Sequence, residues 1–326
     1  MNVGKLTNED LKKIVLERLP ICSTDISKGP AVGLDSAVIR SRDGIMVISS
    51  DPVTGASNEV GSIAIHVSCN DIACAGVRPA AIMLVVIAPA SATKEELITV
   101  IDQASQTARN IGVDIIGGHT EVSDAANRFI LMTTAFGYSD NKNVISAAGA
   151  KAGDTILMTK YAAMEGTAIL ATDFEDRLSN AVSKEDIEKA KELINEISVV
   201  EEGVICGVLG VHAMHDATEG GIMGAVWEIA EASRTGCLID LKKIPVLSMT
   251  RKICDLLNLD PYRLISSGSM IIVTDKPEKV IESLAMENIK CTKIGKIAAK
   301  NRQFKDMDGR TNELTPPGAD ELYKIK

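Results

Sequence analysis

Residues 51–71 read DPVTGASNEVGSIAIHVSCND, and this stretch predicts how the first half of the chain folds. The apolar, β-branched run before it indicates a buried strand, so Asp51 lies where that strand ends. Asn58 is a good N-cap residue, which predicts a helix that begins near it. The apolar stripe of that helix continues into Asn70 and Asp71, so polar groups are expected on its buried face.

The two aspartates of this stretch have two possible explanations. A buried carboxylate destabilises a fold unless another group pairs with it. Asp51 and Asp71 could converge on a divalent cation such as Mg²⁺, which prefers oxygen ligands and often carries phosphates. Alternatively, Asp71 could cap a turn or pair with Arg78. From these residues alone the two explanations are equally supported.

The composition limits the class of protein. A length of 326 residues is too long for one ordinary core and predicts two domains. Hydrophobic residues make up 45% and charged residues 24%, which is typical of a globular protein. The net charge is −9 and no basic patch is visible, so we expect no nucleic-acid partner.

The cysteines and apolar runs predict a cytoplasmic, soluble protein. Seven cysteines are an odd number without close pairs, which argues against a disulfide framework and a zinc ribbon. No cationic and then apolar leader begins the chain. The longest apolar run, residues 80–88, is too short to span a bilayer, so no membrane partner is expected.

Strand and helix patterns alternate along the chain. A carboxylate, Asp35, leads directly into one expected strand, and residues 80–88 form another. Thr93–Glu96 is a capping box that predicts the start of a helix, and residues 128–138 read as a further strand. This alternation predicts an α/β or α+β layer structure.

A change of composition near residues 147–153 marks a domain boundary, because alanine, glycine and lysine dominate there. We therefore expect one domain over residues 1–148 and a second over 149–326. Residues 315–326 are expected to form an exposed extension.

A glycine pair after an expected strand is the first candidate for binding chemistry. Gly117 and Gly118 are expected in a turn, where their backbone N–H groups could approach an anion. Thr120 could donate to a phosphate oxygen, and Glu121 is a possible cation ligand. His119 could act as an acid, a base or a phosphate donor. A lone glycine pair is otherwise most often an ordinary tight turn.

Other polar residues allow both a functional and an ordinary explanation. The glycine-containing loop 216–221 precedes an expected helix and could bind an anion, although an ordinary helix cap explains the loop equally well if it stands alone. Lys28 and Lys160 could offset triphosphate charge or could simply be solvated. His212 and His215 have a spacing that allows zinc, but no further ligand matches it, so zinc is the weaker explanation.

Five motifs, in this order, resemble the aminoimidazole-ribonucleotide synthetase (AIR synthase, PurM-like) superfamily over nearly the whole chain. Its hydrogenase-maturation member HypE is nearest in layout, including the segment 164–170. The matching segments are Gly33–Val38, Asp51, Asn70–Ala73, Gly117–Thr120 and His215–Gly221.

The resemblance implies a fold, an assembly and a cofactor. The fold is an α/β (α+β), two-domain PurM-like fold, with an N-terminal domain that forms a β-barrel across a homodimer. ATP would bind near the dimer interface, and a C-terminal α/β sandwich would cover the cleft. Family members use ATP and Mg²⁺ to phosphorylate an acceptor, which requires positioning and charge neutralisation more than covalent chemistry.

The matched positions, together with Lys28, Lys160 and Glu121 from the patterns above, give the expected site residues. Asp35, Asp51 and Asp71 would hold Mg²⁺, and Glu121 is a fourth possible metal ligand. His119 and Lys28 are the candidate catalytic residues. The expected cofactor-binding residues are Asn70, Gly117, Gly118, Thr120 and Lys160.

Two departures from the pattern bear on the expected reaction. Leu34 stands where the family has the first of two aspartates, and the chain ends at Tyr323–Lys326 without the cysteine that carries a carbamoyl group in HypE. We therefore expect an ATP- and Mg²⁺-dependent enzyme with an unidentified acceptor, either a small molecule or a cysteine of a partner protein. The acceptor group would be an amide, a carbamoyl or a similar group. The alternatives are a non-catalytic nucleotide-binding dimeric scaffold and a small-molecule kinase similar to thiamine-monophosphate kinase.

Overall fold

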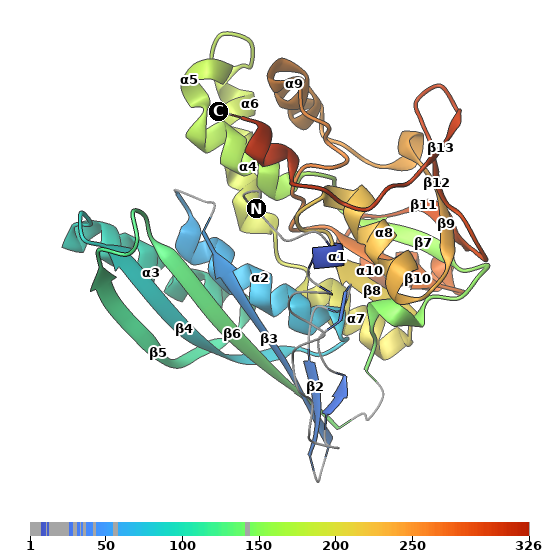
Figure 1. The fold of residues 1–326 in the computed structure, drawn as a ribbon, viewed down its shortest axis with the longest axis horizontal. Helices are drawn as coiled ribbons and strands as arrows, with labels where there is room; N and C mark the ends of the chain where they lie inside the picture. Colours follow the sequence, from blue (N-terminus) through green and yellow to red (C-terminus); the bar gives the residue numbers. More distant parts are fainter. Residues whose placement is uncertain are drawn as a thin grey trace.

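The computed structural model describes residues 8–10, 12, 26–28, 31–32, 34, 37–41, 44–54, 58–140 and 144–325. These residues form a mixed α/β structure with two sheets, one in each half of the chain, as predicted (Figure 1). A bundle that contains α4 (Met164–Asp173), α6 (Lys184–Glu192) and α9 (Ser248–Leu257) lies beside the C-terminal sheet, and the C-terminal segment runs back across it (Figure 1).

The N-terminal sheet has its helices on one face. In the sequence, a short α1 (Asn8–Asp10) precedes the strands of this sheet. The helices α2 (Val60–Cys74) and α3 (Lys94–Ile111) lie between its strands in chain order. Its strand order is β1 (Ile26–Lys28), β2 (Ala37–Ser41), β3 (Gly44–Val53), β6 (Ile130–Ser139), β4 (Pro79–Pro89) and β5 (Asp114–Ser123). The β4–β5 pair is parallel and the other pairs are antiparallel.

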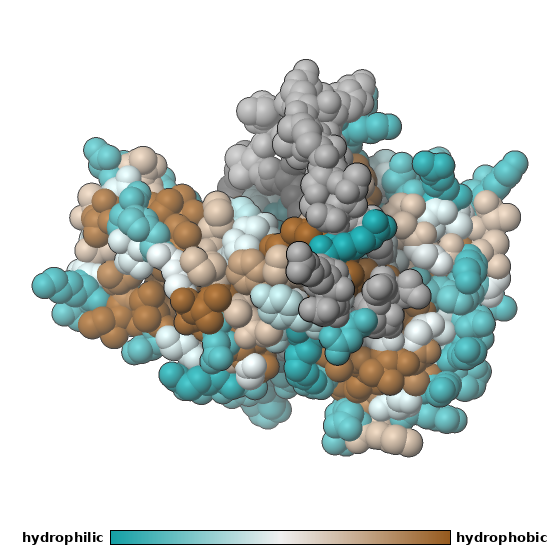
Figure 2. Space-filling model, turned by 90° about the horizontal axis from the view of Figure 1, so that it is seen from below, coloured by the Kyte–Doolittle hydropathy of each residue, from teal (hydrophilic) through white to brown (hydrophobic). Residues whose placement is uncertain are grey.

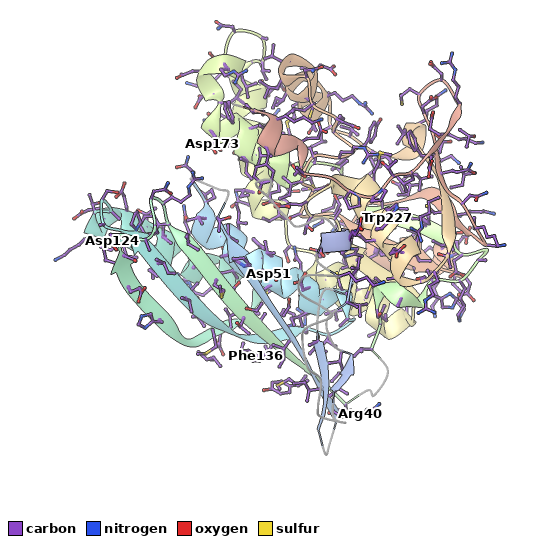
Figure 3. The ribbon with its side chains drawn as sticks, viewed as in Figure 1. Arg40, Asp51, Asp124, Phe136, Asp173 and Trp227 are labelled. Atoms are coloured by element: carbon purple, nitrogen blue, oxygen red, sulfur yellow. The ribbon has the colours of Figure 1, made fainter. Side chains whose placement is uncertain are left out.

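The burial of β3 alternates, which identifies the face that the helices cover. Val47 and Ser49 are buried on the side of α2, whereas Ser50 on the other side is exposed. Phe136 of β6 lies on the side of the sheet opposite the helices (Figure 3). The strand predicted before Asp51 is therefore confirmed, with one face in the core and the other uncovered.

The start of α2 differs from the prediction. The helix begins at Val60, and its N-cap is Glu59 in a left-handed conformation without a side-chain cap. Asn58 instead donates a hydrogen bond from Nδ2 to Asp173 Oδ1 at 3.2 Å. The capping box at Thr93 and Glu96 is confirmed, since both reciprocal hydrogen bonds form at the start of α3.

The C-terminal half contains a sheet with helices on both faces. Its strand order is β13 (Thr311–Glu313), β12 (Arg302–Lys305), β9 (Gly236–Asp240), β11 (Cys291–Ala298), β7 (Thr155–Thr159), β10 (Met270–Thr274) and β8 (Ala213–Asp216). The α-helices are α4 (Met164–Asp173), α5 (Glu175–Leu178), α6 (Lys184–Glu192), α7 (Val200–Leu209), α8 (Gly221–Ala232), α9 (Ser248–Leu257) and α10 (Pro277–Met286). Short 3-10 turns are η3 (Ala147–Gly149), η4 (Leu193–Glu196), η5 (Leu241–Lys243) and η6 (Glu321–Lys324).

The central strand β10 shows why this second sheet is buried on both sides. Ile271 and Val273 belong to the core that includes α8, whereas Met270 and Ile272 belong to the core that includes α7 and α10. All five residues of β10 are buried. A continuous apolar strand is typical of a sheet that is covered on both faces.

The two halves meet where α2 packs on α7. A Cβ atom at Gly203 would lie 2.2 Å from the Ala73 carbonyl oxygen, and one at Gly207 would lie 2.5 Å from the Gly76 oxygen. Only glycine allows the two backbones to approach this closely. The helix with Asp71 is therefore fixed against both halves of the chain.

The C-terminal segment is not the exposed extension that the sequence predicts. Asp320 and Glu321 are buried. Asp320 accepts a hydrogen bond from the Gly220 N–H at 2.8 Å, and Glu321 accepts one from the Asp260 N–H at 3.0 Å. These contacts hold the segment against the second domain. No helix in the described ranges combines the length and the apolar composition that a membrane span needs.

We predict that Gly203→Ala destabilises the protein by about 1–3 kcal/mol, because the added methyl group overpacks the contact with Ala73. Urea unfolding measures the change. Gly318→Ala is the control, because a Cβ atom there meets nothing within 4 Å. Equal unfolding midpoints for the two variants would contradict the close packing of α2 on α7.

Candidate functional site

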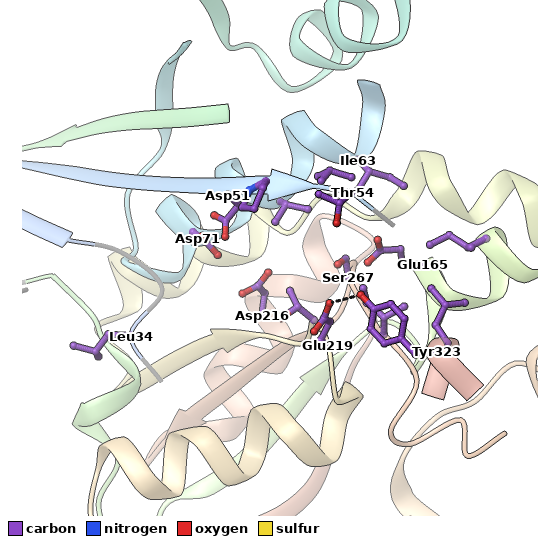
Figure 4. A pocket seen from close by; sticks show the side chains of 17 residues that line it. Leu34, Asp51, Thr54, Ile63, Asp71, Glu165, Asp216, Glu219, Ser267 and Tyr323 are labelled. Carbon is purple, nitrogen blue, oxygen red and sulfur yellow. Dashed lines mark hydrogen bonds between the residues drawn. The ribbon is translucent and has the colours of Figure 1, made fainter. Parts of the chain in front are cut away.

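A cavity of about 280 Å³ lies where β3 and α2 of the N-terminal half meet α4, the loop after β8 and the C-terminal segment (Figure 4). Its described walls come from seven segments of the sequence, at residues 34, 51–54, 63–71, 165–169, 216–219, 265–267 and 322–323. The described lining residues are Leu34, Asp51, Pro52, Val53, Thr54, Ile63, Val67, Asp71, Glu165, Ile169, Asp216, Thr218, Glu219, Ile265, Ser267, Leu322 and Tyr323.

A larger hollow of about 860 Å³ adjoins this cavity. The two share Asp51, Thr54, Glu219 and Tyr323 among their walls. Cavities that bind small molecules commonly measure 300–1,000 Å³. The combined space is therefore large enough for a nucleotide and a small acceptor.

Asp51 and Asp71 meet at one end of the cavity, as the sequence predicts (Figure 4). The Ser49 hydroxyl lies 2.5 Å from Asp71 Oδ2 and 3.2 Å from Asp51 Oδ2, so both carboxylates lie close to one donor. Arg78 does not pair with Asp71. It binds both carboxylate oxygens of Glu201 at 2.7 Å instead.

The chemistry of this pair fits Mg²⁺ bound with a nucleotide. Mg²⁺ is commonly held by one or two carboxylates and completes its shell with phosphate oxygens and water. In the described part of the chain, no three His, Cys, Asp or Glu side chains gather as a ready-made metal site. Asp35, the third predicted ligand, lies outside the described residues.

The second domain contributes carboxylates that were not selected from the sequence. Asp216 ends β8 and is 1% exposed, and its Oδ2 has no hydrogen-bond partner. The N-cap of α8 is Gly220, so Asp216 is not the ordinary helix cap that we considered. Its place in a motif before a glycine pair was the signal that could have identified it.

Glu165 is the second residue that the sequence did not indicate. It lies in the first turn of α4 and reaches the cavity, although only 3% of it is exposed. Burial raises the pKa of its carboxyl to about 7, Ser267 partly opposes this shift, and the negative charges of Asp320 and Glu219 add to it. Glu165 Oε2 has no hydrogen-bond partner.

The C-terminal segment closes one wall of the cavity. The Tyr323 hydroxyl donates to Glu219 Oε1 at 3.1 Å (Figure 4). Burial and the neighbouring carboxylates raise the pKa of Tyr323 to about 12, so the hydroxyl keeps its proton at neutral pH. No pattern in the sequence connects a tyrosine near residue 323 with a loop near residue 219.

The structure does not bring two of the predicted cofactor-binding residues to the cavity. The amide of Asn70 is fully buried and bridges the Ile197 carbonyl and the Val199 N–H, each at 2.9 Å. The Lys160 ammonium donates to the carbonyl oxygens of Glu196 and Ser198 and pairs with Glu202. Both side chains thus connect their elements to residues 196–202.

The predicted glycine turn is part of a strand, so the turn prediction is wrong. Gly117, Gly118, His119, Thr120 and Glu121 all lie in β5 at the edge of the sheet. A Cβ atom at Gly118 would lie 1.7 Å from the Leu84 carbonyl oxygen, which explains the glycine. His119 Nε2 lies 3.1 Å from Glu121 Oε2, and both side chains are exposed.

Within one chain, these β5 residues are distant from the two aspartates. The strands β6 and β4 separate β3 from β5. At ~4.8 Å per strand, Asp51 and Gly118 are roughly 14 Å apart. Single-chain geometry thus separates the expected phosphate cradle from the expected metal ligands.

The remaining predicted residues have other surroundings. Lys28 lies in β1, and its side chain is outside the described part. His212 Nδ1 lies 2.8 Å from Asp154, and His215 Nε2 lies 2.8 Å from Glu228, so the two histidines contact different carboxylates.

We predict that Glu165→Gln changes how stability depends on pH. The folded protein holds the Glu165 proton more tightly than the unfolded chain, whose ordinary value is 4.5, because the folded pKa is about 7. Wild-type stability should therefore fall as pH rises from about 4.5 to about 7. The neutral glutamine avoids this loss, which should amount to roughly 3 kcal/mol.

Urea unfolding of both proteins at pH 5 and pH 8 measures this effect. The variant should gain most relative to wild type at pH 8. Asp320, whose pKa burial raises to about 6, is present in both proteins and largely cancels. An unchanged stability difference between the two pH values would contradict a buried, titrating Glu165.

Comparison with known proteins extends these observations. A protein of Methanocaldococcus jannaschii named for hydrogenase expression and formation is 31% identical over 84% of this chain and 81% of its own. The carbamoyl dehydratase HypE of Cupriavidus necator is 26% identical over 80% of this chain and 76% of its own.

Solved structures share the fold. HypE in complex with ATP superposes with a TM-score of 0.69 at 21% identity, covering 97% of this chain and 94% of that one. The thiamine-monophosphate kinase ThiL in complex with AMPPCP and TMP superposes with a TM-score of 0.73 at 15% identity. The match covers 98% of this chain and 99% of that one. At these identities the likeness concerns the fold alone.

The family models agree with the two-sheet architecture. The N-terminal domain model of AIR synthase related protein matches residues 33–139, and the C-terminal domain model matches residues 151–307. Together they cover most of the chain and every described strand except the edge strands β1 and β13. The chain belongs to the AIR synthase related protein family, in the part of it that contains HypE.

Proposed function

We propose that this protein is an ATP- and Mg²⁺-dependent enzyme that phosphorylates the oxygen of an amide or carbamoyl acceptor, in the maturation of a hydrogenase or a related metalloenzyme. The observation that carries the proposal is the pair Asp51 and Asp71, held beside Ser49 at the end of a cavity. The similarity to HypE proteins supports the reaction class.

Asp51 and Asp71 would hold the metal, with Asp35 as a further ligand. Bound Mg²⁺ neutralises phosphate charge and orients the γ-phosphoryl group. The protein's own contribution is to fix the two carboxylates on different elements, a strand end and a buried helix. The Ser49 hydroxyl can donate to either carboxylate, which stabilises their negative charges before the nucleotide arrives.

The protein is proposed to act as a homodimer in the cytoplasm. Met83, Met132 and Tyr138 are exposed on the N-terminal sheet, and apolar residues gather over that sheet on the left of Figure 2. An uncovered apolar sheet face favours pairing with a second copy. In such a dimer, His119, Thr120 and Glu121 of one copy would approach the nucleotide of the other.

Two other functions share this cavity. A dimeric scaffold would bind nucleotide without turnover, and a kinase similar to thiamine-monophosphate kinase would phosphorylate a phosphate oxygen instead. The structural similarity to ThiL favours considering the kinase. ADP release measured with amide, carbamoyl and phosphate acceptors distinguishes all three.

We predict that ATP with Mg²⁺ stabilises the wild-type protein and fails to stabilise Asp71→Asn. At ligand about a hundredfold above Kd, binding adds about 2.7 kcal/mol, which raises Tm by a few degrees. The variant loses a charge that the metal requires. Asp124→Asn, which changes an exposed aspartate on the far end of the sheet, is the control (Figure 3).

We also predict that Met132→Glu weakens the homodimer at least tenfold, because dimerisation would bury an unpaired charge. Analytical ultracentrifugation over a concentration series measures the dissociation. Ile98→Glu is the matched control, since Ile98 is 57% exposed on α3, away from the uncovered face. A wild-type protein that stays monomeric at high concentration would exclude the dimer.

A further inference from the structure

Glu165 is a buried carboxyl group for which the described lining residues of the cavity provide no cation. It is 3% exposed and lines the cavity, and its Oε2 has no hydrogen-bond partner. A buried polar atom without a partner destabilises a protein. No lysine, arginine or histidine occurs among the described residues that line this cavity. Stability therefore does not explain the residue.

The acidic neighbours of Glu165 are already engaged. Asp320 accepts hydrogen bonds from the backbone N–H groups of Gly220 and Leu322, and Glu219 accepts one from the Tyr323 hydroxyl. Ser267 hydrogen-bonds to the Glu165 carboxyl group, but Glu165 Oε2 is buried beside the cavity without a hydrogen-bond partner. A bound molecule that brings an N–H or O–H donor would satisfy it.

We propose that Glu165 is the catalytic base of the acceptor reaction and takes the N–H proton of a bound amide or carbamoyl group. This inference rests on the proposed function and assigns the proton transfer within it. The acceptor's carbonyl oxygen attacks the γ-phosphorus of ATP, and the bond from that phosphorus to the bridging oxygen breaks. ADP leaves with the electron pair of that bond.

The same step forms a carbon–nitrogen double bond in the acceptor. The electron pair of the N–H bond becomes part of the C=N bond, and the proton moves to Glu165 Oε2. The products are an O-phosphorylated imidate, ADP and a protonated glutamic acid. All atoms and charges are then accounted for without a further reactant.

The charges around Glu165 favour this acceptor over a phosphate. An amide or carbamoyl group presents an oxygen to ATP and an N–H to a base on adjacent atoms. A phosphate monoester is anionic near neutral pH, and Glu165, Glu219 and Asp320 would repel it. A neutral acceptor avoids this repulsion beside Glu165, whereas a phosphate acceptor would need a further cation to offset it.

The surroundings also tune Glu165 for proton transfer near neutral pH. Burial raises its pKa to about 7, Asp320 and Glu219 reinforce this shift, and Ser267 opposes it. A base is most effective when its pKa is near the working pH. The neighbouring Tyr323 stays neutral and so adds no charge of its own.

The test compares wild type, Glu165→Gln, Glu165→Asp and the exposed control Glu282→Gln as full-length proteins. The probes are a synthetic peptide with S-carbamoylcysteine and, separately, thiamine monophosphate, each with ATP and Mg²⁺. ADP release gives kcat and KM between pH 5.5 and 9. The ATP-induced rise in Tm shows, without turnover, that each variant folds and binds nucleotide.

We expect Glu165→Gln to keep the ATP-induced rise in Tm and to lose at least 100-fold in kcat with the carbamoyl peptide. The wild-type rate should rise with pH through about 7. The rate of Glu165→Gln should not show this rise. Glu165→Asp should recover part of the rate, and Glu282→Gln should match wild type.

Three results would overturn the inference. The first is unchanged kcat in Glu165→Gln. The second is turnover of thiamine monophosphate in preference to the carbamoyl peptide. The third is a wild-type protein that binds ATP but releases no ADP with the peptide. A wild-type protein without any ATP-induced rise in Tm would instead refute the proposed function itself.

Discussion

The contact between α2 and α7 is the constraint on which the rest of the structure depends. Two glycine positions allow the backbones of these helices to touch, and Asn70 bridges the segment just before α7 with its amide. The helix α2 is therefore held by the N-terminal sheet on one side and by the C-terminal half on the other. Asp71 is fixed in space because its helix cannot rotate or slide.

The cavity that results is acidic and contains no described cation. Carboxylates from β3, α2, α4 and the loop after β8 line one space, together with apolar side chains. Like charges in a confined volume repel each other, and burial makes the repulsion stronger. A fold with such an arrangement gains stability when a positive ion or a proton enters, which is a physical reason to expect metal–nucleotide binding.

The sequence could predict the parts of the site that one local pattern encodes. Asp51 follows from a strand that ends, and Asp71 from a polar residue on an apolar helix face. Glu165 and Tyr323 could not be predicted as site residues, because their surroundings are formed by residues that are distant in the sequence, such as Glu219. The glycine pair at 117 and 118 was misjudged because close strand packing and tight turns both select glycine.

Two of the expected cofactor-binding residues show the same limit of a local sequence pattern. Asn70 belongs to a matching family motif and Lys160 was selected as a possible partner of phosphate charge, yet the structure engages both with residues 196–202. Asn70 thus joins the two halves of the chain, whereas Lys160 connects two segments of the C-terminal half. Only the pairing of strands and helices distinguishes these roles.

The close approach of α2 and α7 also determines how a molecule can enter. A hinge between the two halves would have to pull apart backbones that are in contact at Gly76 and Gly207. Side chains such as Leu322 and Tyr323, which belong to a short segment held by a few hydrogen bonds, can move at far lower cost. We therefore expect a molecule to enter past the C-terminal segment, without a change in the relative orientation of the two halves.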